Sequence, residues 1–278
     1  MQIESARKPL VPAGIQVLLR DLVHERTGIY FDADRLDVFL DKLEPLAIER
    51  NCFSMLDFYY LLKFEEHGIE DWARVMDALS VQETYFWREM GQIRFLVDSV
   101  IPDWFKRNSN PLRIWTAASA SGEEPYSIQI ALTEAGWDKH PIQIVATDGS
   151  PAAIIKAREA LYREKSFRCF PPELKEKYFI PAVGGSQLRP EIAKRVNFHR
   201  ANLLATDQIS DFARSPVIFC RNVFIYFSPH AIRQTLAAFA SRMPSSGLLF
   251  VGASESLLKL TADFELVDTG QAFVYKRI

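Results

Sequence analysis

The 278-residue chain has few cysteines and histidines, and neither residue type is grouped. Its three cysteines, Cys52, Cys169 and Cys220, lie far apart and form no Cys-x-x-Cys pair. This spacing argues against a disulfide framework and against a structural zinc site. The five histidines are equally scattered, so we expect no metal centre.

The chain also lacks a long apolar run and an excess of charge of one sign. No segment approaches the ~18 consecutive apolar residues of a spanning helix, and the opening stretch has acids and prolines where a signal peptide needs an unbroken apolar core. The 33 basic and 35 acidic residues leave a formal charge of −2, which provides no general attraction to nucleic acid or to an anionic membrane. We therefore expect a cytoplasmic protein without nucleic-acid binding or membrane insertion.

The hydrophobic pattern divides the chain into two parts. From Gly14 to about Leu79, apolar residues recur at helical spacing, which predicts a bundle of three or four helices. From Arg113 onward, short apolar runs alternate with helical stretches. We assign residues 1–79 to an amino-terminal helical domain and residues 80–278 to a second, α/β domain.

Six short apolar segments of the second domain are predicted strands. They are RIWTA (113–117), IQIVATD (142–148), VNFHRAN (196–202), SPVIFCRN (215–222), GLLFVGA (247–253) and AFVYKR (272–277). The helical stretches between them predict a doubly wound, Rossmann-like parallel sheet, with the last two segments as an antiparallel edge pair. Prolines and glycines interrupt residues 164–195, and we interpret residues 179–195 as a loop or hairpin within a β insertion that spans residues 179–198.

Small residues follow the first predicted strand, from Ala117 to Gly122, and let the backbone approach a ligand closely. The turn contains no Gly-x-Gly-x-x-Gly pattern for a pyrophosphate. Glu123 and Glu124 come next, at a helix start whose dipole favours acids, so helix electrostatics alone explains one of them. With a nucleoside along this turn, we expect one carboxylate to face the ligand and the other to face solvent. Spacing alone does not choose between them.

Asp148 closes the second predicted strand and is followed by Ser150 and Pro151. Its alternative role is to cap the next helix, but Ser150 before Pro151 fits that duty better. We therefore predict that Asp148 accepts hydrogen bonds from a ribose diol.

Two further segments place polar residues among apolar ones. In residues 80–89 we interpret Tyr85, Phe86 and Trp87 as a packing seam between the domains, and we expect Arg88 to need a carboxylate partner. The run VIFCRNVFIYF (217–227) is broken by Arg221 and Asn222 where parallel sheets carry out their chemistry, with Tyr226 four residues on. No histidine adjoins Cys220 as an activating base, so this thiol is predicted to be core.

Together these segments closely resemble the CheR family, the chemotaxis receptor glutamate methyltransferases. The resemblance runs from about residue 18 to 276, in the family's order. It rests on TGIYF, ETYFWRE, AASASGEEPYSI, ATDGSPAAIIKAREALY, the NLL of residues 202–204, FCRNVFIYF and GLLFVGASESL.

The resemblance implies S-adenosylmethionine as cofactor and S-adenosylhomocysteine as product. It also implies a helical amino-terminal domain and a class I methyltransferase domain with a small inserted β hairpin. The implied substrate is the side-chain carboxylate of glutamates on the cytoplasmic coiled coil of chemoreceptors, which becomes a methyl ester. The family's cofactor contacts fall on Gln82, Thr84, Arg88, Glu124, Asp148, Asn202, Leu203, Arg221 and Asn222. Arg88 and Tyr226 match the pair proposed to assist methyl transfer.

The sequence departs from the family pattern in three places. Gln82 stands where relatives commonly have Asn, which keeps the amide but lengthens its reach. Residues 41–51 contain only two cations among three acids, where relatives often present several cations to an acidic receptor helix. The insertion lacks the Gly-x-Gly-x-x-x-Gly pattern linked to binding a receptor tail peptide by strand addition, so we expect no such tethering. We expect a monomer.

Two other functions are compatible with these observations. One is a methyltransferase of the same fold that acts on another protein of a signalling array, or on a non-receptor carboxylate, as the weakly basic first domain suggests. The other is a cofactor-binding signalling module with little catalysis. The presence of Arg88, Asp148, Arg221 and Tyr226 argues against the second.

Overall fold

The computed structural model describes residues 8–64 and 68–278, and the chain separates into two compact units. The helical unit extends to Val81 and includes the distant segment Tyr226–Ser228. The sheet unit comprises Gln82–Ile225 and Pro229–Ile278. Tyr226–Ser228 therefore belongs by its contacts to the helical unit, whereas the sequence analysis assigned it to the second domain. No helix of the described ranges is long and apolar enough to cross a membrane.

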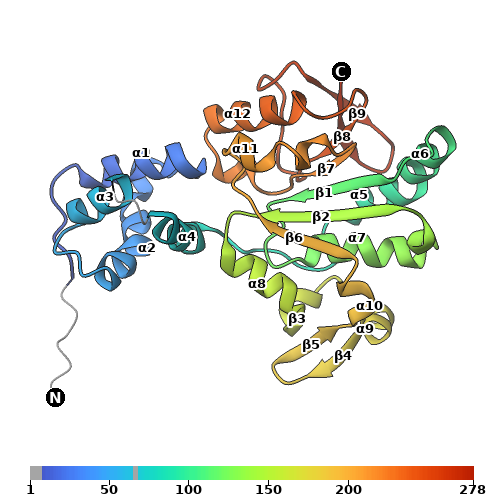
Figure 1. Cartoon of the computed structure of the whole chain (residues 1–278), viewed down its shortest axis with the longest axis horizontal. Coiled ribbons are helices and arrows are strands. Elements are labelled where there is room, and N and C mark those ends of the chain that lie inside the picture. Colours follow the sequence, from blue (N-terminus) through green and yellow to red (C-terminus); the bar gives the residue numbers. More distant parts are fainter. Residues whose placement is uncertain (1–7, 65–67) are drawn as a thin grey trace. The chain divides into compact units, whose positions relative to one another are not determined.

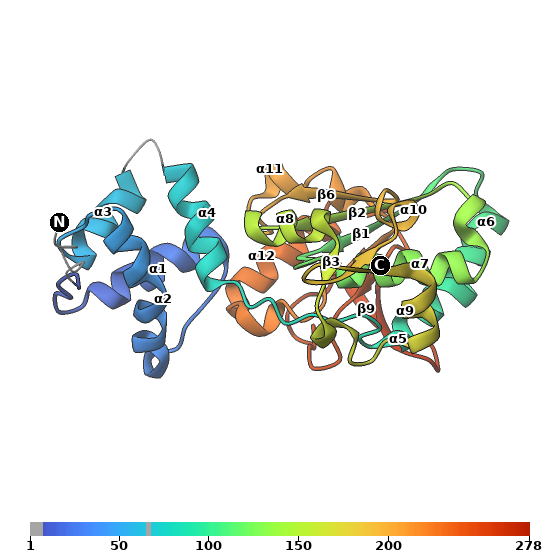
Figure 2. The same ribbon diagram turned by 90° about the horizontal axis from the view of Figure 1, so that it is seen from below.

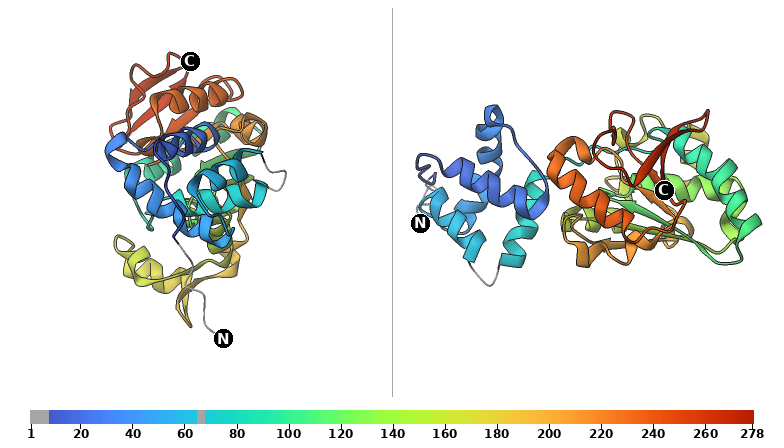
Figure 3. Two further views of the ribbon diagram at one scale, coloured as in Figure 1. Left: turned by 90° about the vertical axis from the view of Figure 1, so that its left-hand side faces the viewer. Right: turned by 90° about the horizontal axis from the view of Figure 1, so that it is seen from above.

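The described part of the helical unit consists of helices that cross one another (Figure 3). They are α1 (Ile15–Thr27), the 3-10 helix η1 (Ala33–Arg35), α2 (Leu36–Glu49), α3 (Met55–Phe64) and α4 (Gly68–Leu79). Their apolar faces meet in a core in which Leu19, Phe39 and Leu43 are fully buried. Helix α1 is terminated by Gly28, which adopts a left-handed conformation and whose N–H donates to the carbonyl of His24.

The sheet unit is built around a seven-stranded sheet (Figure 1). In spatial order its strands are β6 (Val196–Arg200), β2 (Ile142–Asp148), β1 (Leu112–Ala117), β7 (Val217–Phe219), β8 (Leu248–Phe250), β10 (Phe273–Arg277) and β9 (Phe264–Asp268). All are parallel except β10, which is antiparallel to both of its neighbours. The carboxyl ends of the parallel strands and the amino end of β10 therefore lie on the same side of the sheet.

The predicted fold class is confirmed, with differences at the last strands and in the insertion. All six predicted strands are present, and the last two, β8 and β10, pair antiparallel as expected. The prediction that this pair forms the edge is wrong, because the unpredicted strand β9 pairs with the outer side of β10. Strand β6 begins at Val196, so the last residues of the predicted insertion belong to the main sheet.

Helices connect the strands of the sheet unit (Figure 2). They are α5 (Met90–Phe95), the π-helical turn η2 (Leu96–Val100), α6 (Ile101–Arg107), α7 (Glu123–Glu134), η3 (Trp137–Lys139), α8 (Pro151–Glu159), η4 (Glu164–Phe167), α9 (Pro172–Tyr178), α10 (Pro190–Ala193), α11 (Thr206–Ile209), η5 (Phe212–Arg214), η6 (Phe224–Tyr226) and α12 (Pro229–Ala240). The chain progresses from β1 toward one edge of the sheet and from β7 toward the other. Right-handed crossovers therefore place α7 and α8 on one face and α12 on the opposite face.

A second, three-stranded sheet lies beside α9 and α10 (Figure 1). Its order is β3 (Leu161–Tyr162), β5 (Gly185–Leu188) and β4 (Phe179–Ala182), and both pairs are antiparallel. Strands β4 and β5 form the predicted hairpin. Strand β3 was not predicted, because two residues are too few to show an alternating pattern.

Candidate active site

The loop after β1 has a strained backbone. Ala118, Ala120 and Gly122 have φ values of 55°, 47° and 92°, so alternate residues take the left-handed conformation. For alanine this conformation costs about 1–2 kcal/mol. The loop is held by β2, because the N–H of Ser119 donates to the carbonyl of Thr147 at 2.8 Å. Within the described residues, the buried Ser119 hydroxyl has no hydrogen-bond partner. Strain of this kind is typical of a ligand-binding loop.

Asp148 secures the same loop. Its carboxylate accepts the N–H of Ala120 at 2.9 Å and the N–H of Ser150 at 2.8 Å, and the side chain is largely buried. The predicted cap of α8 is confirmed, since the Ser150 hydroxyl accepts the N–H of Ala153. Asp148 is therefore relieved of capping but holds the β1 loop in addition to any ligand. A carboxylate oxygen can accept more than one hydrogen bond, so Asp148 is chemically suited to accept from a ribose hydroxyl as well.

Glu123 is buried, so the expectation that one acid of the pair faces solvent is wrong. Its two oxygens accept hydrogen bonds from the hydroxyls of Ser166 at 3.0 Å and Ser121 at 2.8 Å. Burial raises the pKa of the Glu123 carboxyl, and the hydrogen bonds from the two serines only partly oppose this effect. The partner Ser166 lies 43 positions away in the sequence. Glu123 therefore points away from solvent and joins the loop to residues 161–188, the segment from β3 to β5. We call this segment the inserted region; it begins earlier than the insertion predicted from the sequence.

Replacing Glu123 with glutamine is expected to stabilise the protein at pH 8. Because the folded pKa is raised, the folded state binds more protons than the unfolded state above the ordinary value of 4.5. Wild-type stability therefore falls as the pH rises from 4.5 through the raised pKa, and glutamine removes this loss. Either serine hydroxyl can accept from the new amide. We expect a gain of about 1–2 kcal/mol in urea unfolding at pH 8.

The matched control for this substitution is Glu159→Gln at the exposed end of α8. The gain from Glu123→Gln should shrink as unfolding is measured at pH values approaching 4.5. A gain independent of pH, or one equalled by the Glu159 variant, would contradict a buried charge as its cause.

Glu124 forms a buried ion pair with Arg221. Arg221 follows β7, and its Nη1 lies 3.1 Å from a Glu124 oxygen while its Nη2 lies 3.2 Å from a Glu89 oxygen. The guanidinium also donates to the carbonyl of Arg88 at 2.8 Å. Burial raises the pKa of the Glu124 carboxyl, and the charge of Arg221 opposes this rise. Among the described residues the buried Nε of Arg221 has no hydrogen-bond partner, so one donor of this cluster is available to a ligand.

Arg88 retains a largely unpaired guanidinium. Its Nη1 donates to the carbonyl of Glu83 at 2.8 Å, its Nε lies 3.9 Å from Glu89, and the side chain is 25% exposed. Arg88 therefore has the expected carboxylate partner in Glu89, but the distance of 3.9 Å is too long for a hydrogen bond. The guanidinium also lies over the ring of Tyr85, with 5.5 Å between its central carbon and the ring centroid.

The aromatic residues before Arg88 pack inside the sheet unit. The Phe86 ring is fully buried and contacts Tyr162 and three phenylalanines of the inserted region, Phe167, Phe170 and Phe179. Trp87 packs edge-on against Phe170. The interpretation of Phe86 and Trp87 as a seam between the domains is therefore wrong. They anchor the segment that carries Arg88 to the inserted region.

Glu255, which the sequence analysis did not single out, binds the loop after β7. One of its oxygens accepts the N–H groups of Val223, Phe224 and Ile225, at 2.8, 2.7 and 3.4 Å. The other accepts those of Asn222 and Gly252, at 2.8 and 2.6 Å. Five backbone donors thus converge on one carboxylate.

Glycine is required at position 252 for this arrangement. A Cβ there would lie 2.4 Å from Nδ2 of Asn222, whose own φ is 58°. The loop therefore needs both the glycine and the carboxylate. The only local signal for this role is the Gly-x-x-Glu spacing of residues 252–255, which is too short to predict it.

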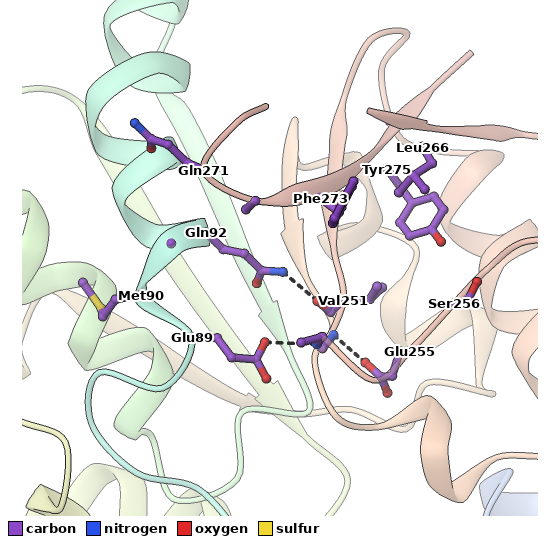
Figure 4. A pocket seen from close by; sticks show the side chains of 14 residues that line it. Glu89, Met90, Gln92, Val251, Glu255, Ser256, Leu266, Gln271, Phe273 and Tyr275 are labelled. Carbon is purple, nitrogen blue, oxygen red and sulfur yellow. Dashed lines mark hydrogen bonds between the residues drawn. The ribbon is translucent and has the colours of Figure 1, made fainter. Parts of the chain in front are cut away.

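A cavity of about 430 Å³ adjoins this cluster (Figure 4). Its walls come from the amino end of α5, the segment after β8, and β9 with β10. Glu89 and Glu255 point from two sides toward the backbone between them, where Glu89 accepts the N–H of Ala253 at 3.2 Å. Gln92 closes the wall by donating to the carbonyl of Val251 at 2.7 Å. Glu89 therefore contacts both the Arg221 cluster and the cavity, and the sequence analysis missed it too.

The remaining predicted residues lie at neighbouring strand ends. Gln82 donates to the hydroxyl of Ser150 at 3.4 Å and accepts from Lys156 at 3.3 Å, which places its amide beside the end of β2. Thr84 follows two residues later, in the same segment without regular secondary structure. After β6, the Asn202 side chain accepts the N–H of Leu204 at 3.1 Å, and Leu203 is buried.

Cys220 and Tyr226 flank the polar pair of the β7 segment. Cys220 is fully buried, and burial raises its thiol pKa well above the ordinary value, so its assignment to the core is confirmed. Tyr226 ends the 3-10 helix η6 and is partly buried. Tyr226 itself belongs to the helical unit.

Comparison with known proteins identifies the family. The family described as CheR methyltransferase, SAM binding domain, matches residues 82–273. Chemotaxis protein methyltransferase 2 of Vibrio cholerae is 34% identical over 254 residues, which covers 89% of this chain and 87% of the relative. Chemotaxis protein methyltransferase 1 of Pseudomonas aeruginosa is 30% identical over 267 residues, covering 93% and 96%. The chain belongs to the CheR family of S-adenosylmethionine-dependent methyltransferases.

Proposed function

We propose that the protein transfers a methyl group from S-adenosylmethionine to glutamate side chains of chemoreceptors and so forms methyl esters. The observation that carries this proposal is the Arg88 guanidinium, which is partly exposed and lies as far as 3.9 Å from the carboxylate of Glu89. It stands beside the strand-end cluster and has donors left for a substrate or cofactor carboxylate.

The residues present fit the cofactor. The left-handed backbone at Ala118, Ala120 and Gly122 permits close approach, and the buried Ser119 hydroxyl and Arg221 Nε are polar atoms without partners among the described residues. Asp148 offers acceptors for a ribose diol, and Arg221 offers a donor for an amino-acid carboxylate. The bound cofactor supplies a sulfonium methyl group, an electrophile that needs no metal and no reductant.

The acceptor chemistry needs alignment more than proton transfer. A glutamate carboxyl with an ordinary pKa near ~4.3 is ionised at neutral pH and attacks the methyl carbon without a general base. This agrees with the described residues of the site named above, none of which is a histidine. Arg88 would orient the carboxylate and Tyr226 would close the site, so the catalytic gain would come from proximity.

The proposed partner is the cytoplasmic coiled coil of a chemoreceptor, which places the protein in the cytoplasm. We propose that it acts as a monomer, without tethering through a receptor tail peptide. The hairpin β4–β5 turns at Val183 and Gly184 and lacks the glycine pattern associated with such binding.

A second candidate, methylation of another signalling protein, is favoured by the charges of α2. Of the two cations in residues 41–51, Arg50 pairs with Asp71 at 3.2 Å and Lys42 donates to the carbonyl of Ala78 at 3.1 Å. Asp71 offsets the charge of Arg50, so Lys42 is the remaining cation of this segment for an acidic receptor helix.

Incubation with methyl-labelled S-adenosylmethionine separates these candidates. Receptor cytoplasmic fragments should acquire label that base releases as methanol, and peptide mapping should locate it on glutamates. Substitution of the mapped glutamates by alanine is the control and should abolish the label. Base-stable label would contradict ester formation. Labelling of other signalling proteins in preference to receptors would support the second candidate.

A further inference from the structure

The helical unit holds the residues that follow the active-site loop. Ile29 forms an isolated antiparallel bridge with Phe227, and the N–H of Tyr30 donates to the carbonyl of Tyr226 at 2.9 Å. Nε2 of His24 and the Ser228 hydroxyl are hydrogen-bonded at 2.7 Å. Three consecutive residues of the distant segment are thus bound by one end of α1 and the turn after it. We call His24, Gly28, Ile29 and Tyr30 the α1 clamp.

Gly28 makes this contact possible. Its φ is +78°, and a Cβ built there would lie 2.9 Å from the Phe227 ring. The glycine therefore serves two purposes, since it permits the turn after α1 and leaves room for the ring. Gly14, which precedes the other end of α1, has the same φ of +78°, but a Cβ there would meet nothing within 4 Å.

Aromatic contacts fix the clamp itself. The rings of His24 and Tyr30 meet edge to face with 5.3 Å between their centroids. The Arg20 guanidinium lies over the Tyr30 ring, 5.3 Å from its centroid. Contacts between a cation and an aromatic ring, and between aromatic rings at such angles, are attractive. They hold the side chains of the clamp together.

The chain connects this clamp directly to the proposed site. Glu255 binds the backbone N–H groups of residues 222–225, and the clamp binds residues 226–228. Tyr226 is thus the first residue bound by the helical unit, directly after the last residue bound by Glu255 of the sheet unit. Fixing the backbone on both sides restricts where its hydroxyl lies.

We infer that the α1 clamp is a positioning element for Tyr226, so that the helical unit contributes to turnover through the active-site tyrosine as well as through any substrate it binds. This inference rests on the proposed function, in which Tyr226 assists methyl transfer. The clamp residues act through Tyr226 and are not themselves catalytic. They should therefore affect kcat much more than the affinity for the cofactor.

Two glycine variants give a matched test. Gly28→Ala and Gly14→Ala introduce the same methyl group at the same φ, but only the first displaces the Phe227 ring. We expect Gly28→Ala to lower kcat for receptor methylation about tenfold or more, since small misplacements of reacting groups are costly. Its dissociation constant for S-adenosylmethionine should stay within about twofold of wild type. Gly14→Ala should leave both values near those of wild type.

A milder pair covers the case in which Gly28→Ala fails to fold. Ser228→Ala removes the hydroxyl that contacts His24, and Ser228→Thr keeps it. We expect Ser228→Ala to lower kcat about threefold, a loss equivalent to one weak hydrogen bond, and Ser228→Thr to restore it. Equal kcat values in Gly28→Ala, Gly14→Ala and Ser228→Ala would overturn the inference. So would a loss of cofactor affinity equal to the loss of kcat.

Hydrogen exchange tests the clamp without any substrate. The Tyr30 amide, which donates to Tyr226, should exchange faster in Gly28→Ala than in Gly14→Ala. Failure of the wild-type protein to form methyl esters would refute the proposed function, while the exchange comparison would still report on the clamp. Unchanged Tyr30 exchange in Gly28→Ala would refute the clamp even in an active enzyme.

Discussion

Replacing Arg88 with alanine is expected to lower kcat for glutamate methylation by about 10³-fold, close to a complete loss of turnover. The guanidinium contacts Glu83 and Tyr85, and the carboxylate of Glu89 is 3.9 Å away. It therefore keeps donors for the carboxylate of a ligand. Alanine removes the group that would orient the negatively charged reactant. The side chain is 25% exposed, so the free energy of unfolding should change little.

Arg168→Ala is the matched control for this experiment. Arg168 pairs with Glu83, and its guanidinium lies 3.7 Å from the centroid of the Tyr85 ring, so it contacts the same two residues as Arg88. It is exposed and has no place in the proposed site. Methyl-ester formation should be near normal in Arg168→Ala. Arg88→Lys should recover only part of the activity, because an ammonium cannot form the two parallel bonds of a guanidinium. Normal turnover by Arg88→Ala would refute the proposed role.

The sequence predicted those parts of the fold whose pattern is local. Strands β1, β2 and β7 are buried along most of their length and appear as short apolar runs. Strand β9 was missed because Phe264 is its one buried residue and Leu266 is exposed, so no alternation marks it. Central strands of a parallel sheet are covered on both faces and need apolar residues there, whereas a strand at the edge does not. Its pairing with β10 comes from tertiary contacts.

The candidate site was predictable where chemistry follows a strand end, and not where it depends on distant partners. Arg221 was found because a cation interrupts an apolar run. Glu123 was misplaced because its partner Ser166 is remote in sequence, and Phe86 was misplaced because its ring partners lie in the inserted region. Glu255 was missed because its partners are backbone N–H groups, which every sequence possesses and no motif reveals.

Replacing Glu255 with glutamine is expected to destabilise the protein by about 2–4 kcal/mol. Its carboxylate accepts five backbone N–H groups, three on one oxygen and two on the other. Glutamine keeps one acceptor oxygen but directs an NH₂ group at the remaining donors, which are then left unsatisfied. Glu255 therefore fixes the backbone of the loop that connects Arg221 to Tyr226. Urea unfolding of the two proteins at neutral pH measures the effect.

The same substitution should lower kcat more than the unfolded fraction explains. At neutral pH and low denaturant both proteins remain folded, so a further loss of about tenfold or more would report on loop geometry rather than on folding. Cofactor affinity should fall as well, because Asn222 lies in the same loop. These two readouts distinguish Glu255 from the α1 clamp, whose variants should spare cofactor affinity.

Glu265→Gln provides the control for Glu255→Gln. The substitution makes the same change of side chain at an exposed position. There the native Glu265 pairs with Lys276 at 3.4 Å. Exposed pairs of this kind contribute at most about 1 kcal/mol, so this variant should unfold and turn over like wild type. An equal effect of the two substitutions would mean that the loop after β7 holds its shape without Glu255. A large effect confined to Glu255 would mean that one carboxylate fixes the backbone between Arg221 and Tyr226, and through it the geometry of the proposed site.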